Sequence, residues 1–135
     1  MIESTAVRDA MLEFYDRIVA NDVGSFDRLV ADDAALLVIG TAPGEWITDR
    51  ARLRKGFEVD GYGIVPGPSP AGWEAGELGW FVDEPRFDFP GGIHLTARLT
   101  TVLLNRGDGW QLLHMHTSVG VPDDEVEALQ TRWSR

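Results

Sequence analysis

Two histidines near the end of the chain are the residues whose type and spacing point most directly to chemistry. His114 and His116 flank Met115 within a run of β-forming residues. Because side chains alternate across a strand, both imidazoles are expected on one face of a sheet. Such a pair binds zinc only when a third ligand comes from a neighbouring strand. The remaining histidine, His94, is expected roughly 20 Å away along the partner strand, and the chain has no cysteine. We therefore expect no metal and no cofactor.

The short motifs of common catalytic and nucleotide-binding sites are absent. The sequence contains no G-x-S-x-G, so Ser118 lies in no nucleophile elbow. It contains neither G-x-G-x-x-G nor G-x-x-x-x-G-K-[ST], which would cradle phosphates. The best candidate for a catalytic group is Tyr15, because it falls on the buried face of a predicted helix, where its hydroxyl needs a hydrogen-bond partner or faces a pocket. Its expected role is that of a proton donor.

The N-terminal half of the chain is predicted to be mainly helical. Apolar residues at helical spacing predict a helix over residues 5–20, capped by Ser4 or Thr5. A short helix follows near 26–30, then a buried strand over 34–40 and an extended segment at 45–47. A third helix is expected to begin after Thr48 or Asp49. Residues 60–72, rich in glycine and proline, predict a loop or an irregular edge strand.

The C-terminal half is predicted to be mainly β. Strands are expected over 78–82, 93–104 and 110–121, the last two joined as an antiparallel hairpin, before a helix that begins at Pro122. Helices followed by a sheet indicate an α+β fold. One strand parity of the hairpin is apolar and is expected to face the helices, and the other parity is polar and ionisable.

Length and charge limit what the chain can be. Its 135 residues suit a single domain, residues 1–135. A net charge of −10 repels phosphate backbones and anionic membranes, so nucleic-acid and membrane partners are not expected. No apolar run is long enough to span a bilayer, and the first residues do not form a signal peptide. These features favour a cytoplasmic location.

The whole pattern resembles the nuclear transport factor 2-like superfamily, and in particular its SnoaL-like domains, which are similar to the association domain of calcium/calmodulin-dependent kinases. The resemblance rests on the Gly40-Thr41 turn followed by Glu45-Trp46, on the run 98–103, and on the Asp-Gly-Trp turn that leads into His116-Thr117-Ser118. It implies a cone-shaped fold: a strongly curved, mainly antiparallel sheet wrapped around N-terminal helices, with a short C-terminal helix and a pocket between sheet and helices.

The resemblance also limits the function. Ketosteroid isomerases of this fold combine a helix-1 tyrosine with two acidic groups. Tyr15 matches the tyrosine, but the acid positions fall near 39–41 and 98–100, where no carboxylate stands, so steroid isomerisation is not expected. The arginines with which kinase association domains line their pocket are replaced by Thr101 and Thr117. A strongly anionic ligand is therefore not expected either.

The sequence thus predicts a homodimer with a pocket for a small, largely apolar or aromatic molecule. The reaction classes implied by the resemblance are isomerisation, cyclisation and hydration; the alternative is a non-catalytic dimerisation or ligand-sensing module. The predicted pocket residues are Tyr15, Trp46, Leu99, Thr101, Met115 and Thr117. The predicted dimer interface is the outer sheet face, with Arg98, Thr100, Trp110, Leu112, His116 and Ser118.

Overall fold

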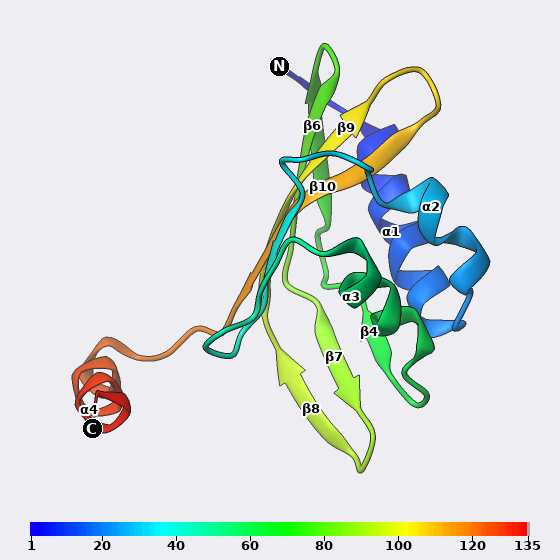
Figure 1. The fold of residues 1–135 in the computed structure, drawn as a ribbon. Coiled ribbons are helices and arrows are strands. Elements are labelled where there is room, and N and C mark those ends of the chain that lie inside the picture. The colour runs from blue at the N-terminus through cyan, green and yellow to red at the C-terminus, as the bar shows by residue number, and fades with distance from the viewer. Residues whose placement is uncertain (135) are drawn as a thin grey trace.

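The computed structural model describes residues 1–134, in which the first three helices cover the concave side of a curved sheet (Figure 1). The α-helices are α1 (Thr5–Val19), α2 (Phe26–Leu29), α3 (Arg50–Arg54) and α4 (Asp123–Trp133). Short 3-10 turns at Val23–Ser25 and Lys55–Glu58 adjoin α2 and α3. The strands are β1 (Ile2–Glu3), β2 (Leu37–Ile39), β3 (Trp46–Ile47), β4 (Gly63–Val65), β5 (Ala71–Ala75), β6 (Leu78–Asp83), β7 (Arg86–Phe89), β8 (Ile93–Thr96), β9 (Arg98–Asn105) and β10 (Trp110–Ser118).

The strands form two sheets, and the larger one carries the fold. Its order is β1-β5-β6-β9-β10-β2-β3, with antiparallel neighbours except for the parallel pair of β10 and β2. The smaller sheet has the order β4-β7-β8. The predicted α+β class and the predicted antiparallel pairing of β9 with β10 are confirmed. The segment 60–72, predicted as a loop or irregular edge strand, contributes β4 to the small sheet.

Helix α1 supplies much of the core. The predicted cap is confirmed, because Ser4 Oγ accepts a hydrogen bond of 3.1 Å from the backbone N–H of Val7. Its buried face consists of Val7, Met11, Phe14 and Tyr15. Phe57, from the turn after α3, packs edge-on against Phe14 at 5.6 Å between ring centroids. The helix is thus fixed against both the sheet and the connecting segments.

The prediction of a single strand over 93–104 is wrong, because Ala97 interrupts it and separates β8 from β9. The Ala97 N–H donates a 3.0 Å hydrogen bond to the carbonyl of Pro85, which separates β6 from β7 in the same way. Proline has no N–H for a sheet ladder, so the pairing of β6 cannot continue past it. The segments β6–β7 and β8–β9 both pass from one sheet to the other at this point. The small sheet therefore folds over the open end of the large one. Strand β7 was not predicted.

A β-bulge in β10 overturns the predicted parity of its first half. The register with β9 shifts between Leu112 and His114, so the faces swap at the extra residue. Leu112 is 2% exposed and lies in the core instead of on the outer face. Trp110 also points inward: a Cβ added to Gly79 would lie 3.2 Å from its ring and 2.7 Å from Val7 on α1. Beyond the bulge, Thr117 is buried and His116 is exposed, as predicted.

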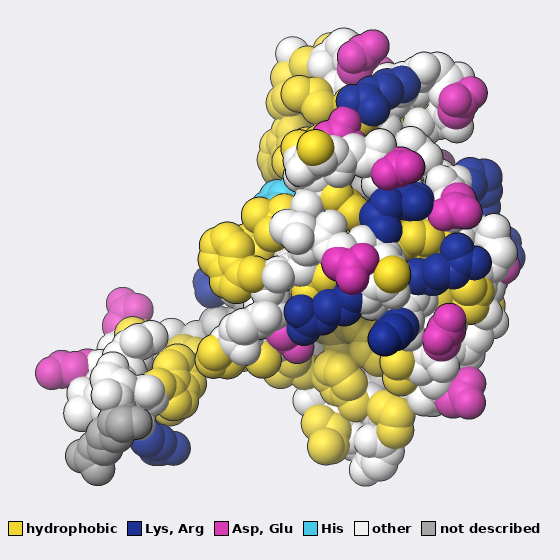
Figure 2. Space-filling view, viewed as in Figure 1, with side chains coloured by type: hydrophobic (Ala, Val, Ile, Leu, Met, Phe, Trp, Pro, Cys, Tyr) yellow, Lys and Arg dark blue, Asp and Glu magenta, His cyan; other side chains and the backbone are white. Residues whose placement is uncertain are grey.

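Helix α4 stands apart from the other helices (Figure 1). It begins at Asp123, one residue after the predicted start at Pro122, which takes the N-cap position, and none of its residues Asp123–Trp133, all of which the structure describes, is buried. In the space-filling view, hydrophobic side chains run from the end of the sheet to the side of α4 that faces the body (Figure 2). No helix within residues 1–134 is both long enough and apolar enough to cross a membrane.

Candidate functional site

A cavity of about 210 Å³ lies between α1, the small sheet and the concave face of the large sheet. It exists because β7 and β8 leave the large sheet at Pro85 and Ala97 and fold over its open end. The lining residues are Phe14, Tyr15, Ile18, Val38, Gly40, Thr41, Glu45, Tyr62, Ile64, Phe87, Phe89, Leu95, Leu99, Met115 and Thr117. For comparison, an engineered cavity of about 150 Å³ in another protein holds benzene. The space therefore suits one ring with a short substituent.

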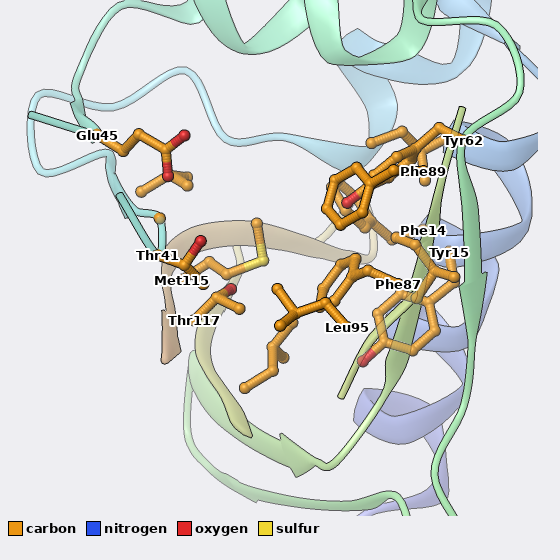
Figure 3. A pocket seen from close by; sticks show the side chains of 15 residues that line it. Phe14, Tyr15, Thr41, Glu45, Tyr62, Phe87, Phe89, Leu95, Met115 and Thr117 are labelled. Carbon is orange, nitrogen blue, oxygen red and sulfur yellow. The ribbon is translucent and has the colours of Figure 1, made fainter. Parts of the chain in front are cut away.

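One wall of this cavity is aromatic (Figure 3). The Tyr62 ring lies 6.0 Å from that of Phe87 and 5.5 Å from that of Phe89. Phe87 and Phe89 are two residues apart on β7, which places both rings on the same side of the small sheet. Burial, and then the negative charge of Glu45, raise the pKa of Tyr62, so its hydroxyl stays protonated.

The opposite rim carries the one charged side chain of the described lining residues, Glu45 (Figure 3). The turn between β2 and β3 folds this side chain back, and Glu45 Oε2 accepts a 3.0 Å hydrogen bond from the N–H of Ala42. A Cβ added to Gly40 would lie 1.9 Å from Oε2 and 2.8 Å from Cδ. The Glu45 carboxylate thus occupies the space that any larger residue at position 40 would need.

Four of the six predicted pocket residues line the cavity, and two do not. Tyr15, Leu99, Met115 and Thr117 surround it. Trp46 pairs with Ile39, next to the inward-facing Val38, so it lies on the outer sheet face and is 66% exposed. Its prediction at the pocket rim is wrong for that reason.

Thr101, the other predicted residue that misses the cavity, lies within the sheet core. It is 1% exposed between its strand neighbours Met115 and Phe81, and its hydroxyl has no hydrogen-bond partner in the described chain. Cross-strand neighbours on one face lie close together, so Met115, which lines the cavity, lies beside it.

The hydroxyl of Tyr15 is engaged by a buried acid. Tyr15 Oη donates a 3.1 Å hydrogen bond to Asp83 Oδ2. Asp83, at the end of β6, is 3% exposed and also accepts from the N–H groups of Gly67, at 3.1 Å, and Glu84, at 2.8 Å. Burial, followed by the charge of Asp83, raises the pKa of Tyr15. The ring of Tyr15 faces the cavity while its proton is held by Asp83.

The amino-acid sequence identifies the family of the chain that forms this cavity. The SnoaL-like domain family matches residues 7–122. The chain belongs to this family. No curated protein sequence matches this SnoaL-like domain.

Solved structures share its fold at low sequence identity. A nuclear transport factor 2-like superfamily protein from Salmonella enterica has a TM-score of 0.73 and 15% identity, covering 87% of this chain and 90% of that one. A nuclear transport factor 2-like protein from Cytophaga hutchinsonii has a TM-score of 0.69 and 18% identity, covering 83% of this chain and 93% of that one. A candidate calcium/calmodulin-dependent protein kinase II association domain from Xanthomonas campestris has a TM-score of 0.67 and 15% identity, covering 85% of this chain and 86% of that one. The SnoaL-like domain thus has the nuclear transport factor 2-like fold expected from its sequence.

Sequence reasoning missed several residues of the SnoaL-like cavity. Glu45 lies beyond a Pro-Gly turn, and only the direction of that turn brings its carboxylate over Gly40. Phe87 and Phe89 carry a detectable signal, because an aromatic at every second position is typical of a strand with one buried face. Tyr62 carries no such signal, and neither does Asp83, which does not line the cavity but binds the hydroxyl of Tyr15, because the partners of both lie far away in the chain.

The predicted interface residues of the SnoaL-like domain fall into two groups. Arg98, His116 and Ser118 line a hollow of about 500 Å³ outside the sheet, which α4 bounds with Val126, Leu129 and Trp133. Thr100 is exposed next to them, paired with His116. Trp110 and Leu112 lie on the inner face, because the bulge in β10 reverses the face of the residues before it.

Neither histidine of the predicted pair belongs to a metal-binding cluster in the described part of the chain. No group of three or more His, Asp or Glu within residues 1–134 is placed to hold an ion. The His114 ring makes a 2.9 Å hydrogen bond through Nδ1 with the carbonyl oxygen of Leu37 on the parallel strand β2. This contact fixes the imidazole in a structural role between two strands.

Proposed function

We propose that this SnoaL-like domain binds a small, largely apolar or aromatic molecule in the cavity between α1 and the two sheets. The observation that carries the proposal is the aromatic and aliphatic lining of a cavity of about 210 Å³ in which Tyr62, Phe87 and Phe89 present their rings. Apolar lining with a few convergent polar groups is typical of ligand sites. Here Thr41, Thr117 and Glu45 supply those groups.

Among the described lining residues, Glu45 is the side chain best suited to take a proton from such a ligand. The Tyr15 proton is held by Asp83, and its raised pKa makes it a weak acid toward a ligand. Glu45 is the remaining acid–base group with a carboxylate at the cavity, so proton abstraction is the step that its chemistry supports. This assigns the catalytic role to Glu45 instead of Tyr15, within the isomerase, cyclase and hydratase classes.

The test is a titration with a neutral ring compound, benzyl alcohol, followed by NMR. Amide shifts of Met115, Thr117 and Leu95 are expected to move together and to saturate. The double variant Met115→Trp, Thr117→Leu, which fills the cavity, should abolish these changes. Shifts that do not saturate, or that persist in the filled variant, would contradict the proposal.

A second candidate function, homodimerisation, is favoured by the outer face of the large sheet. The strand registers align one row of side chains across it, which joins Leu37, His114, Val102, Trp80 and Trp73 and is apolar except for His114. The Trp73 and Trp80 rings are stacked at 4.2 Å. A contiguous apolar patch is typical of an interaction surface, and we propose a second copy of this chain as its partner. The cytoplasm remains the proposed location.

A further inference from the structure

The cavity combines two features that a site for a purely neutral ligand would not need. One wall is aromatic, and the opposite rim carries the carboxylate of Glu45 (Figure 3). No arginine, lysine or histidine belongs to the described lining. The charge of the cavity is therefore negative and uncompensated from within.

A basic side chain of an adjoining hollow does not neutralise Glu45. Arg52 lines the hollow next to the cavity, to which Glu45 also contributes. No ion pair between Arg52 and Glu45 occurs in the described residues, although the neighbouring Arg50 and Arg54 both pair with Asp27. Glu45 keeps one hydrogen bond, from the Ala42 N–H, and its other oxygen has no such partner in residues 1–134.

Gly40 gives this arrangement a physical cause. Its missing side chain leaves the space in which the Glu45 carboxylate lies, 1.9 Å from where a Cβ would be. The charge of Glu45 also reaches across to the aromatic wall, where it contributes to the raised pKa of Tyr62. The carboxylate and the ring cluster thus act on the same space.

We propose that the preferred ligand is an organic cation: an ammonium group on a small ring or short alkyl body, with the nitrogen toward Glu45. Aromatic ring faces attract cations through their quadrupole, and a carboxylate accepts hydrogen bonds from an ammonium group. The net charge of −10 also raises the local concentration of cations around the molecule. This inference rests on the proposed ligand cavity and names the class of ligand.

The experiment compares three probes of nearly the same shape: benzylammonium, benzyl alcohol and benzoate. Calorimetric titration at fixed ionic strength should show that benzylammonium binds about five- to tenfold more tightly than benzyl alcohol, and that benzoate binds weakest. Glu45→Gln should remove the preference for benzylammonium over benzyl alcohol, because glutamine keeps an acceptor oxygen for the Ala42 N–H but carries no charge.

Two further variants separate a site from general attraction to an acidic protein. Gly40→Ala should displace the carboxylate and reduce the preference as Glu45→Gln does. Glu58→Gln, on an exposed carboxylate that does not line the cavity, should leave the preference unchanged. Benzylammonium binding that persists when Met115→Trp, Thr117→Leu fills the cavity would overturn the inference.

The outcomes distinguish this inference from the proposed function. If all three probes bind with similar affinity, or if Glu45→Gln keeps the preference, the cation site is wrong and the ligand cavity stands. If no probe binds at millimolar concentration, both are wrong.

Discussion

The hydroxyl of Tyr15 and the carboxylate of Asp83 meet at 3.1 Å between Oη and Oδ2, 68 residues apart in the chain. This hydrogen bond joins α1 to the end of β6, next to the point where the strands leave the large sheet. A Cβ on Gly67, whose N–H also serves Asp83, would lie 2.6 Å from the Glu84 carbonyl oxygen. The buried carboxylate therefore joins three segments of the chain next to Tyr15, which lines the cavity.

We expect Tyr15→Phe to destabilise the fold by ~1–3 kcal/mol, because Asp83 then loses a donor while it stays buried. Urea denaturation measures the change in the free energy of unfolding. The matched control is Tyr62→Phe: the Tyr62 hydroxyl makes no hydrogen bond to another group of residues 1–134, so this variant should change stability by less than ~0.5 kcal/mol. If the two variants lowered the free energy of unfolding equally, the hydrogen bond from Tyr15 to Asp83 would not be what stabilises the fold.

Alkaline pH should destabilise the protein through its two tyrosines. Burial raises the pKa of both in the folded state, helped by Asp83 at Tyr15 and by Glu45 at Tyr62. The stabilisation is fully present below the unfolded-state pKa of about 10 and is lost as the pH rises above it. Each tyrosine should lower the free energy of unfolding by about 1.4 kcal/mol per pH unit there. Tyrosinate absorbance near pH 10 in a still-folded protein would contradict this prediction.

Filling the cavity should cost little stability. We expect the double variant Met115→Trp, Thr117→Leu to change the free energy of unfolding by less than ~1 kcal/mol, because the added side chains enter existing space. Leu103→Trp, at a buried position that does not line the cavity, should cost ~1–3 kcal/mol or more by overpacking. Thermal and urea denaturation compare the two, and a double variant as unstable as Leu103→Trp would argue against an open cavity.

A charge on the outer sheet face should abolish dimerisation. Light scattering of the native chain at micromolar concentration is expected to give twice the mass of one chain. Val102→Asp places a carboxylate in the middle of the apolar row and should give a monomer. Ile93→Asp, on the small sheet at a residue 64% exposed, is the control and should remain dimeric. A monomeric native chain would contradict the proposed interface.

Metal analysis tests the prediction made from the histidine pair. Protein purified without chelator should contain less than a tenth of an equivalent of zinc per chain. The reason is that His114 is held by the Leu37 carbonyl and the described residues near it supply no third ligand. One equivalent of a transition metal that disappears with His116→Ala would overturn it.

Local periodicity was enough to predict the parts of this fold that depend on neighbouring residues. The buried face of α1, the Ser4 cap and the alternation of Leu99 and Leu103 on β9 follow from spacings of 3.6 and 2 residues. Four cavity residues were identified for the same reason, since inward-facing positions on α1 and the hairpin converge wherever those elements pack together.

The tertiary structure decided everything that depends on a distant partner. The bulge in β10 reversed the faces of Trp110 and Leu112, because one extra residue changes the parity of all positions before it. The pairing of Trp46 with Ile39 turned that ring away from the cavity. The break at Ala97 required the carbonyl of Pro85. Only the path of the turn after Gly40 placed the Glu45 carboxylate at the cavity, because a chain of this length has many turns with similar residues and local sequence does not say what lies across them.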